Sequence, residues 1–187
     1  MNQRTVRSRR PARRAFTLIE TALATVIVGV GVLAMVTAQT SFLRQNAWSN
    51  RASVAERLGN EIRELALNLP QRDPVTGAEN WGPETSELDF DDYDDLDDFD
   101  GDGSGTIFSA ELGNGPVDAQ RRIIPNMDGW AQVIQVFNVS GTNIAEGPGE
   151  QTDGATNMMV IRVTVTYQGP NDDSEQIMTT VQWVAPE

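Results

Sequence analysis

Cysteine, histidine and lysine are all missing from this chain of 187 residues. Without cysteine the chain can form neither a disulfide bond nor a thiolate metal site. Without histidine it lacks the commonest general base and metal ligand, so zinc chemistry and catalysis of the Ser-His or Cys-His kind are not expected. Carboxylates would allow a glycosidase-like acid pair, but they crowd into one loop, where solvation or metal binding is the more common use. We therefore expect a protein that is not an enzyme.

Positive charge is scarce and unevenly placed. All fourteen basic residues are arginine, six of them lie within the first fourteen positions, and the 27 acidic residues all come later. If residues 1–15 are a leader that is removed, the remaining chain carries 14 − 6 = 8 positive and 27 negative charges, a balance of −19. This balance argues against binding nucleic acid through a basic surface.

One apolar stretch dominates the first third of the chain, where no charged side chain occurs between Glu20 and Arg44. The stretch is long enough to supply the ~20 helical residues that cross a ~30 Å hydrocarbon layer. Glu20 stands near its start, and an unpaired carboxylate inside a membrane costs at least ~2.5 kcal/mol. We therefore expect Glu20 to have a cationic partner.

Two ordinary explanations of this stretch leave Glu20 without a role. One is an export signal that ends at Val36-Thr37-Ala38, from which signal peptidase would release a soluble calcium-binding or carbohydrate-binding domain beginning at Gln39. The other is a plain single-span anchor with its positive end inside.

The run Phe16-Thr17-Leu18-Ile19-Glu20 follows an Arg-rich leader and precedes the apolar helix. It resembles the processing site of type IV prepilins and type II secretion pseudopilins. The resemblance implies that a prepilin peptidase cuts between Ala15 and Phe16 and methylates the new amino group. It also implies that Glu20 compensates the N-terminal charge of a neighbouring subunit during assembly. The chain departs from the family at Ala15, where the family usually has glycine.

This resemblance, which covers residues 13 to about 35, implies a function, partners and a location. The chain would be a minor pilin or pseudopilin, a structural subunit of a type IV pilus-like or type II secretion filament, and residues 21–34 resemble the PilV-type minor pilins more closely than the major ones. Its partners would be the prepilin peptidase, the inner membrane, and other pilin or pseudopilin subunits contacted through the N-terminal helix. Its head would lie in the periplasm until assembly.

Changes in composition divide the chain into five segments. They are a leader (1–15), a transmembrane and assembly helix (16–43), an amphipathic helix (44–69), an acidic variable region (70–122) and an antiparallel sheet (123–187). Together they predict an α+β fold in which a long N-terminal helix packs on a small sheet, as in pilins.

Two periodic patterns support this architecture. Apolar residues at helical spacing form a stripe that should cover the sheet; they are Val54, Leu58, Ile62, Leu65 and Leu69. Alternating residues predict strands at 130–139, 158–167 and 175–184. The turn sequence at 169–173 predicts that the last two strands pair as an antiparallel hairpin.

The acidic run at 89–98 has an apolar residue at every third position, namely 90, 93, 96 and then 99. A solvated loop is the default interpretation of so many aspartates. The regular apolar spacing favours a short helix or turn that is held on the surface of the head.

Residues 100–111 resemble an EF-hand calcium loop over all twelve positions. The resemblance implies oxygen ligands from the side chains of Asp100, Asp102, Ser104 and Glu111 and from the backbone carbonyl of Thr106. No flanking helix pair is evident, so we expect a lone calcium loop that stabilises the head. The alternative is a flexible Gly/Asp loop that matches by chance.

Overall fold

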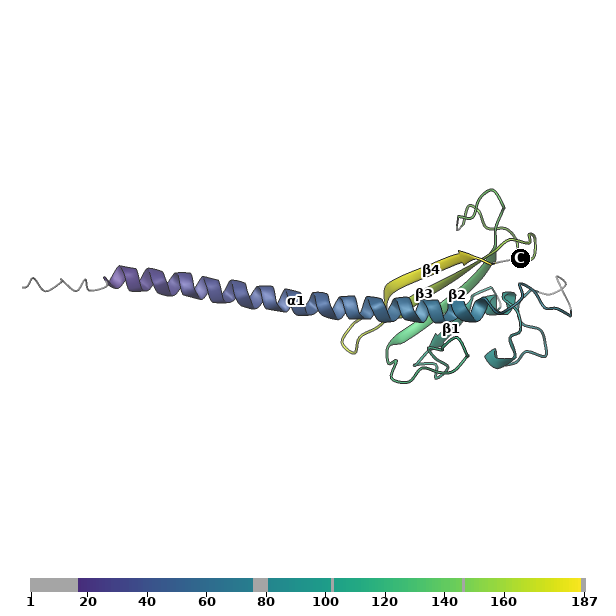
Figure 1. The fold of residues 1–187 in the computed structure, drawn as a ribbon, viewed down its shortest axis with the longest axis horizontal. Helices are drawn as coiled ribbons and strands as arrows, with labels where there is room; N and C mark the ends of the chain where they lie inside the picture. The colour runs from purple at the N-terminus through teal and green to yellow at the C-terminus, as the bar shows by residue number, and fades with distance from the viewer. Residues whose placement is uncertain (1–16, 76–80, 102, 146, 186–187) are drawn as a thin grey trace, which may run out of the picture. The chain divides into compact units, whose positions relative to one another are not determined.

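The computed structural model describes residues 17–75, 81–101, 103–145 and 147–185 of the chain. The fold is α+β, as predicted, with one long N-terminal helix and a four-stranded antiparallel sheet. The chain separates into two compact units, Met1–Ala47 and Trp48–Glu187. Figure 1 shows the helix and strand order.

Helix α1 runs from Leu18 to Ala66, 49 residues, and is therefore about 73 Å long at ~1.5 Å per residue. We expected it to continue to about Leu69, but the chain turns over residues 67–69 and reaches Pro70 outside the helix. Proline lacks the N–H that a continuing helix would need, and it disfavours helical geometry at the residue before it, so the helix stops early.

Within the first unit, every described residue of α1 is exposed in the isolated chain. The helix contains an 18-residue window with a mean hydropathy of 2.2, so it is long and apolar enough to cross a membrane or to act as a signal sequence. Several threonine side chains in this part form hydrogen bonds with the backbone of the same helix. Thr21, Thr25, Thr37 and Thr40 each donate a hydroxyl hydrogen bond to a carbonyl three or four residues earlier.

The sheet of the second unit has the order β1-β2-β3-β4, and all its neighbouring strands are antiparallel. The strands are β1 (Thr106–Ser109), β2 (Trp130–Asn138), β3 (Met159–Tyr167) and β4 (Gln176–Val184). The last three lie within a residue of the predicted ends, and β3 and β4 form the predicted hairpin. The short strand β1 was not predicted; it lies inside the loop for which we predicted a calcium site.

The C-terminal part of α1 packs on this sheet through the predicted stripe (Figure 1). Leu58 and Ile62 are buried in the same core cluster as Val163 of β3. Burying a side chain of this kind contributes about 1.5–3 kcal/mol to stability. The helix approaches β4 so closely that a Cβ on Gly59 would lie 2.7 Å from Cγ2 of Val181. A glycine at this position therefore sets the distance between helix and sheet.

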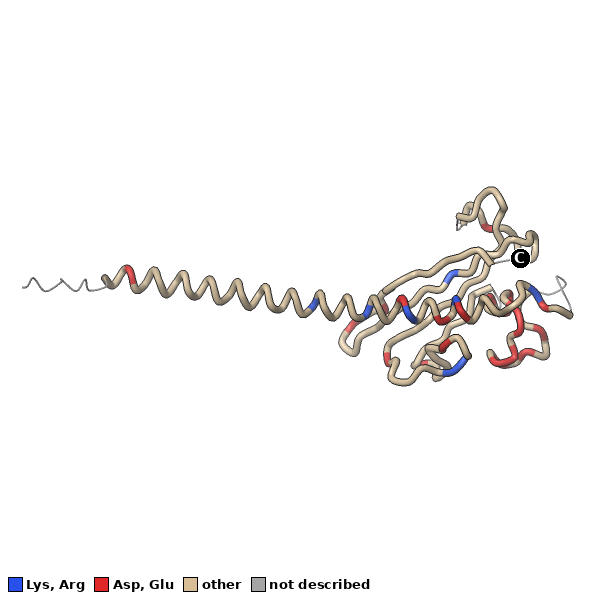
Figure 2. The backbone as a smooth tube through the Cα atoms, viewed as in Figure 1, with Lys and Arg blue, Asp and Glu red and all other residues tan. Residues whose placement is uncertain are grey.

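Acidic residues gather in the segment that precedes β1 (Figure 2). This segment contains two 3-10 helices, η1 (Phe90–Asp92) and η2 (Asp97–Asp100). Its aromatic residues pack with Phe108 of β1 in a cluster of edge-to-face and tilted rings. Between ring centroids, Phe90 lies 4.3 Å from Phe108 and 5.8 Å from Phe99. The short-helix interpretation of the acidic run is confirmed.

The solvated-loop interpretation is wrong for three aspartates of the run, because Asp95, Asp97 and Asp98 are buried, and Asp100 just after the run is buried as well. The physical reason is the three-residue spacing of the apolar side chains. Anchoring Leu96 and Phe99 in the core draws the residues between them below the surface as well.

Candidate functional site

The start of α1 carries the first predicted site. Glu20 lies in the first helical turn, and its Oε2 accepts a hydrogen bond from the backbone N–H of Thr17 at 3.5 Å. This is the backward half of a capping box, in which a glutamate at the third helical position satisfies the N–H of the capping residue. The two residues of the predicted cleavage site, Ala15 and Phe16, lie outside the described residues.

The predicted calcium loop contributes four described ligand candidates, while Asp102 lies outside the described residues. Asp100 is buried in η2, and its Oδ2 accepts a hydrogen bond from Nε1 of Trp81 at 2.9 Å. Ser104 and Glu111 are exposed in turns, and Thr106 begins β1 opposite Ile134.

The backbone of this loop is tightly closed at its N-terminal end. The carbonyl of Asp100 accepts the N–H groups of Gly103 and Gly105 at 3.1 and 2.9 Å. Gly105 has a φ of +81°, and a Cβ there would lie 2.3 Å from the carbonyl oxygen of Ile134, so only glycine fits. The calcium loop stays a prediction, because neither carboxylate cluster found among the described residues includes Asp100 or Glu111.

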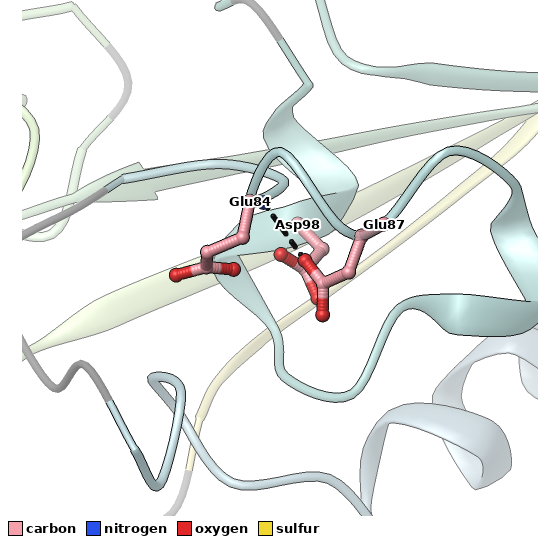
Figure 3. Close-up of side chains that lie close together, drawn as sticks. All are labelled: Glu84, Glu87 and Asp98. Atoms are coloured by element: carbon pink, nitrogen blue, oxygen red, sulfur yellow. Dashed lines mark hydrogen bonds between the residues drawn. The ribbon is translucent and has the colours of Figure 1, made fainter.

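Those two clusters lie slightly earlier in the chain. In the first, Glu84, Glu87 and Asp98 each offer a carboxylate oxygen, and all three oxygens lie within 4.8 Å of one another (Figure 3). In the second, the same holds for Asp94, Asp95 and Asp98. Asp98 belongs to both, and we name the four buried or half-buried members of the two clusters the acidic centre: Glu84, Glu87, Asp95 and Asp98.

Backbone N–H groups hold the carboxylates of the acidic centre in place. Oδ2 of Asp98 accepts the N–H groups of Asp94 and Asp95 at 3.0 and 3.1 Å. Oδ1 of Asp95 accepts those of Asp97 and Asp98 at 3.0 and 3.2 Å. The dashed line in Figure 3 marks the bond from the N–H of Glu84 to Oε2 of Glu87, 2.9 Å long. The segment is therefore folded around its own acidic side chains.

Burial changes the acidity of these groups. Burial, together with the nearby charge of Asp97, raises the pKa of Asp95 to about 8. Burial raises the pKa of Glu87 to about 7, and the pKa values of Asp97 and Asp98 to about 6. Moving an ionised carboxylate out of water is unfavourable, so these groups retain protons at a pH where exposed carboxylates are ionised.

Sequence reasoning missed this centre because its members are separated along the chain. Glu84 and Glu87 match no calcium motif, and Asp98 precedes the predicted loop. The useful signal was the apolar residue at every third position of the run, which indicates that the intervening aspartates are drawn inward.

Comparisons of the chain with protein-family models, with curated proteins and with solved structures gave no match. The described residues offer a carboxylate at the start of an apolar helix and a group of buried oxygen ligands in the head. A carboxylate in an apolar helix is costly inside a membrane unless it has a partner, and a group of oxygen ligands suits a hard cation.

Proposed function

We propose that this chain is a minor pilin or pseudopilin, a structural subunit of a type IV pilus-like or type II secretion filament. Prepilin peptidase cuts it between Ala15 and Phe16 and methylates Phe16. The observation that carries the proposal is the acidic side chain of Glu20 in the first turn of a 49-residue helix whose first part is apolar and exposed. Neither an export signal nor a simple anchor needs a carboxylate there.

The proposed role of Glu20 follows from the cost of burying charge. Among packed apolar helices a carboxylate is tolerated when a cation pairs with it. After cleavage, the α-amino group of Phe16 on an adjacent subunit supplies that cation. A subunit that entered at the wrong height would leave Glu20 unpaired, so a single ion pair selects the axial register.

The two parts of α1 divide the work of such a subunit. Its N-terminal part spans the inner membrane before assembly and contacts other subunits afterwards. Gly29 and Gly31 lie in this part with open space around them in the isolated chain. These glycines suit close packing between helices, since small residues let the backbones approach. The alternative is that they mark a point where the helix extends on assembly, because glycine has a low helix propensity. The head lies in the periplasm and acts as a structural element without catalytic activity.

We further propose that residues 100–111 bind calcium and that the ion stabilises the head. The supporting observations are the buried Asp100 at the first position and the tight turn at Gly105. A periplasmic or surface site of this kind would have a dissociation constant of roughly 10⁻⁴–10⁻³ M.

N-terminal analysis of the mature protein tests the proposed processing. The chain is purified from membranes of cells that contain a prepilin peptidase, and its first residue is determined by mass spectrometry. N-methyl-Phe16 is the expected result. Cells with an inactive peptidase are the matched control and should yield the chain with its leader. A mature chain beginning at Gln39 would refute the proposal and support signal-peptidase release of a soluble domain.

A further inference from the structure

Three carboxylates from two parts of the segment before β1 converge on one point, namely those of Glu84, Glu87 and Asp98 (Figure 3). Their oxygens all lie within 4.8 Å of one another. Calcium holds oxygen ligands at roughly 2.3–2.6 Å, so two oxygens on the same ion lie at most about 5 Å apart. All three carboxylates can therefore reach a single ion.

Asp98 supplies an independent sign that a ligand belongs here. Its side chain is 1% exposed, and its Oδ1 has no hydrogen-bond partner among the described residues. Its other oxygen, Oδ2, is already used by the N–H groups of Asp94 and Asp95. A buried carboxylate oxygen without a partner is unfavourable, so Oδ1 is the atom that is left for a cation.

The sequence around Glu87 and Asp98 is acidic and carries no cation of its own. Between residues 81 and 100 the sequence has ten acidic residues and no basic one. In the part of the chain that the structure describes, Glu87 and Asp98 form no ion pair. The guanidinium of Arg121 approaches the segment, but it donates to the carbonyl oxygens of Phe90, Asp91 and Tyr93.

We propose that Glu84, Glu87 and Asp98 bind a hard divalent cation, calcium, at a site separate from the loop 100–111. The ligand set consists of oxygen atoms alone, which calcium prefers, and the chain has no histidine or cysteine for softer metals. Backbone hydrogen bonds already hold Glu87 and Asp98, so the ion finds its ligands in place. The ion joins the turn at 84–87 to η2. The site depends on the head alone and would stand if the filament function were wrong.

Calcium titration of the full chain in detergent micelles tests the site. The protein is stripped with a chelator and titrated with calcium chloride in a calorimeter, and its melting temperature is measured with and without the ion. Glu87→Gln and Asp98→Asn keep the side-chain shape and remove the charge. The matched control is Asp92→Asn, which changes an exposed acidic residue of the same segment. Glu111→Gln weakens the predicted loop separately.

We expect Glu87→Gln and Asp98→Asn each to weaken calcium binding at this site at least tenfold and to remove its share of the melting-temperature gain. Asp92→Asn should stay within twofold of the unaltered chain. In calcium-free buffer both variants should melt at the same temperature or higher, because each removes a charge from a crowded buried group. A purely structural role for these carboxylates would instead lower the melting temperature.

Glu111→Gln separates the two sites. We expect part of the heat of calcium binding to remain in the Glu111→Gln variant and to disappear in the double variant that also carries Glu87→Gln. That result assigns the remaining heat to the site formed by Glu84, Glu87 and Asp98. If Glu111→Gln alone removes all calcium binding, or if Glu87→Gln binds calcium with unchanged affinity and stoichiometry, the site proposed here is refuted.

Discussion

Gln132 offers a direct test of how the helix is tied to the sheet. Its side chain is fully buried on β2 and makes three hydrogen bonds. Nε2 donates to the carbonyls of Leu58 on α1 and of Val117 at 2.9 and 3.1 Å, and Oε1 accepts the N–H of Val117 at 2.8 Å. Gln132→Met has a similar volume and removes all three bonds. It also leaves the buried N–H of Val117 without an acceptor, which by itself costs about 1–3 kcal/mol.

Adding the two lost donor bonds at about 0.5–1.5 kcal/mol each gives a loss of about 2–6 kcal/mol. Because methionine is apolar, burying it recovers part of this loss, and we expect Gln132→Met to lower the free energy of unfolding by about 2–4 kcal/mol. Gln132→Glu keeps the acceptor for Val117 but places a carboxylate against two carbonyls, so it should destabilise the head at least as much.

Urea unfolding followed by tryptophan fluorescence measures the effect, on residues 48–187 and again on the full chain in detergent. The slope of stability against urea should not change, because the same surface is exposed on unfolding. The matched control is Gln176→Met on the exposed face of β4, which should stay within about 0.5 kcal/mol. A loss below about 1 kcal/mol for Gln132→Met would show that these three bonds do not hold helix and sheet together.

Four further predictions follow from the helix and the head. Glu20→Val should be processed and inserted normally but be absent from sheared filaments on immunoblots, and normal incorporation would contradict the ion-pairing role. Residues 46–187 should be soluble, with a circular dichroism spectrum of mixed helix and sheet; a disordered spectrum in calcium would contradict the architecture. Calcium at ~100 times its dissociation constant should stabilise the head by about 2.7 kcal/mol per site, and Glu111→Ala should abolish the part due to the loop 100–111, as read from melting curves. In metal-free buffer, urea titrations should show that the free energy of unfolding falls between about pH 4 and pH 8. The reason is that the buried carboxyl groups have pKa values raised to about 6 to 8, so the folded head holds more protons than the unfolded chain in this range. A flat or rising profile would contradict burial of these carboxylates.

Periodicity made the regular elements predictable. The stripe containing Leu58 and Ile62 and the alternation along β3 each repeat several times, and both fall on buried faces. Strand β1 was missed because it has four residues and lies in a Gly-rich segment, too short for an alternating pattern to be visible. Its position comes from pairing with β2, which is not a local property.

The acidic centre was out of reach for a different reason. Sequence reasoning treats a run of charge as a surface feature, since ionised groups prefer water. Here the burial of the apolar residues of the run, such as Leu96 and Phe99, outweighs that preference, and the neighbouring aspartates are buried together with them. The turn at 84–87 then folds back on Asp98, and no spacing rule relates residues that meet only through a loop.

The contact between Gly59 and Val181 also bears on the order of events during synthesis. The two positions are 181 − 59 = 122 residues apart, and they must come together before the stripe on α1 is covered. At ~5–20 residues per second the ribosome needs roughly 6–25 s to make the intervening chain. During that interval the apolar stripe of α1 has been made but β4, which will cover it, has not. The nascent chain therefore exposes an apolar helix surface until the head is complete.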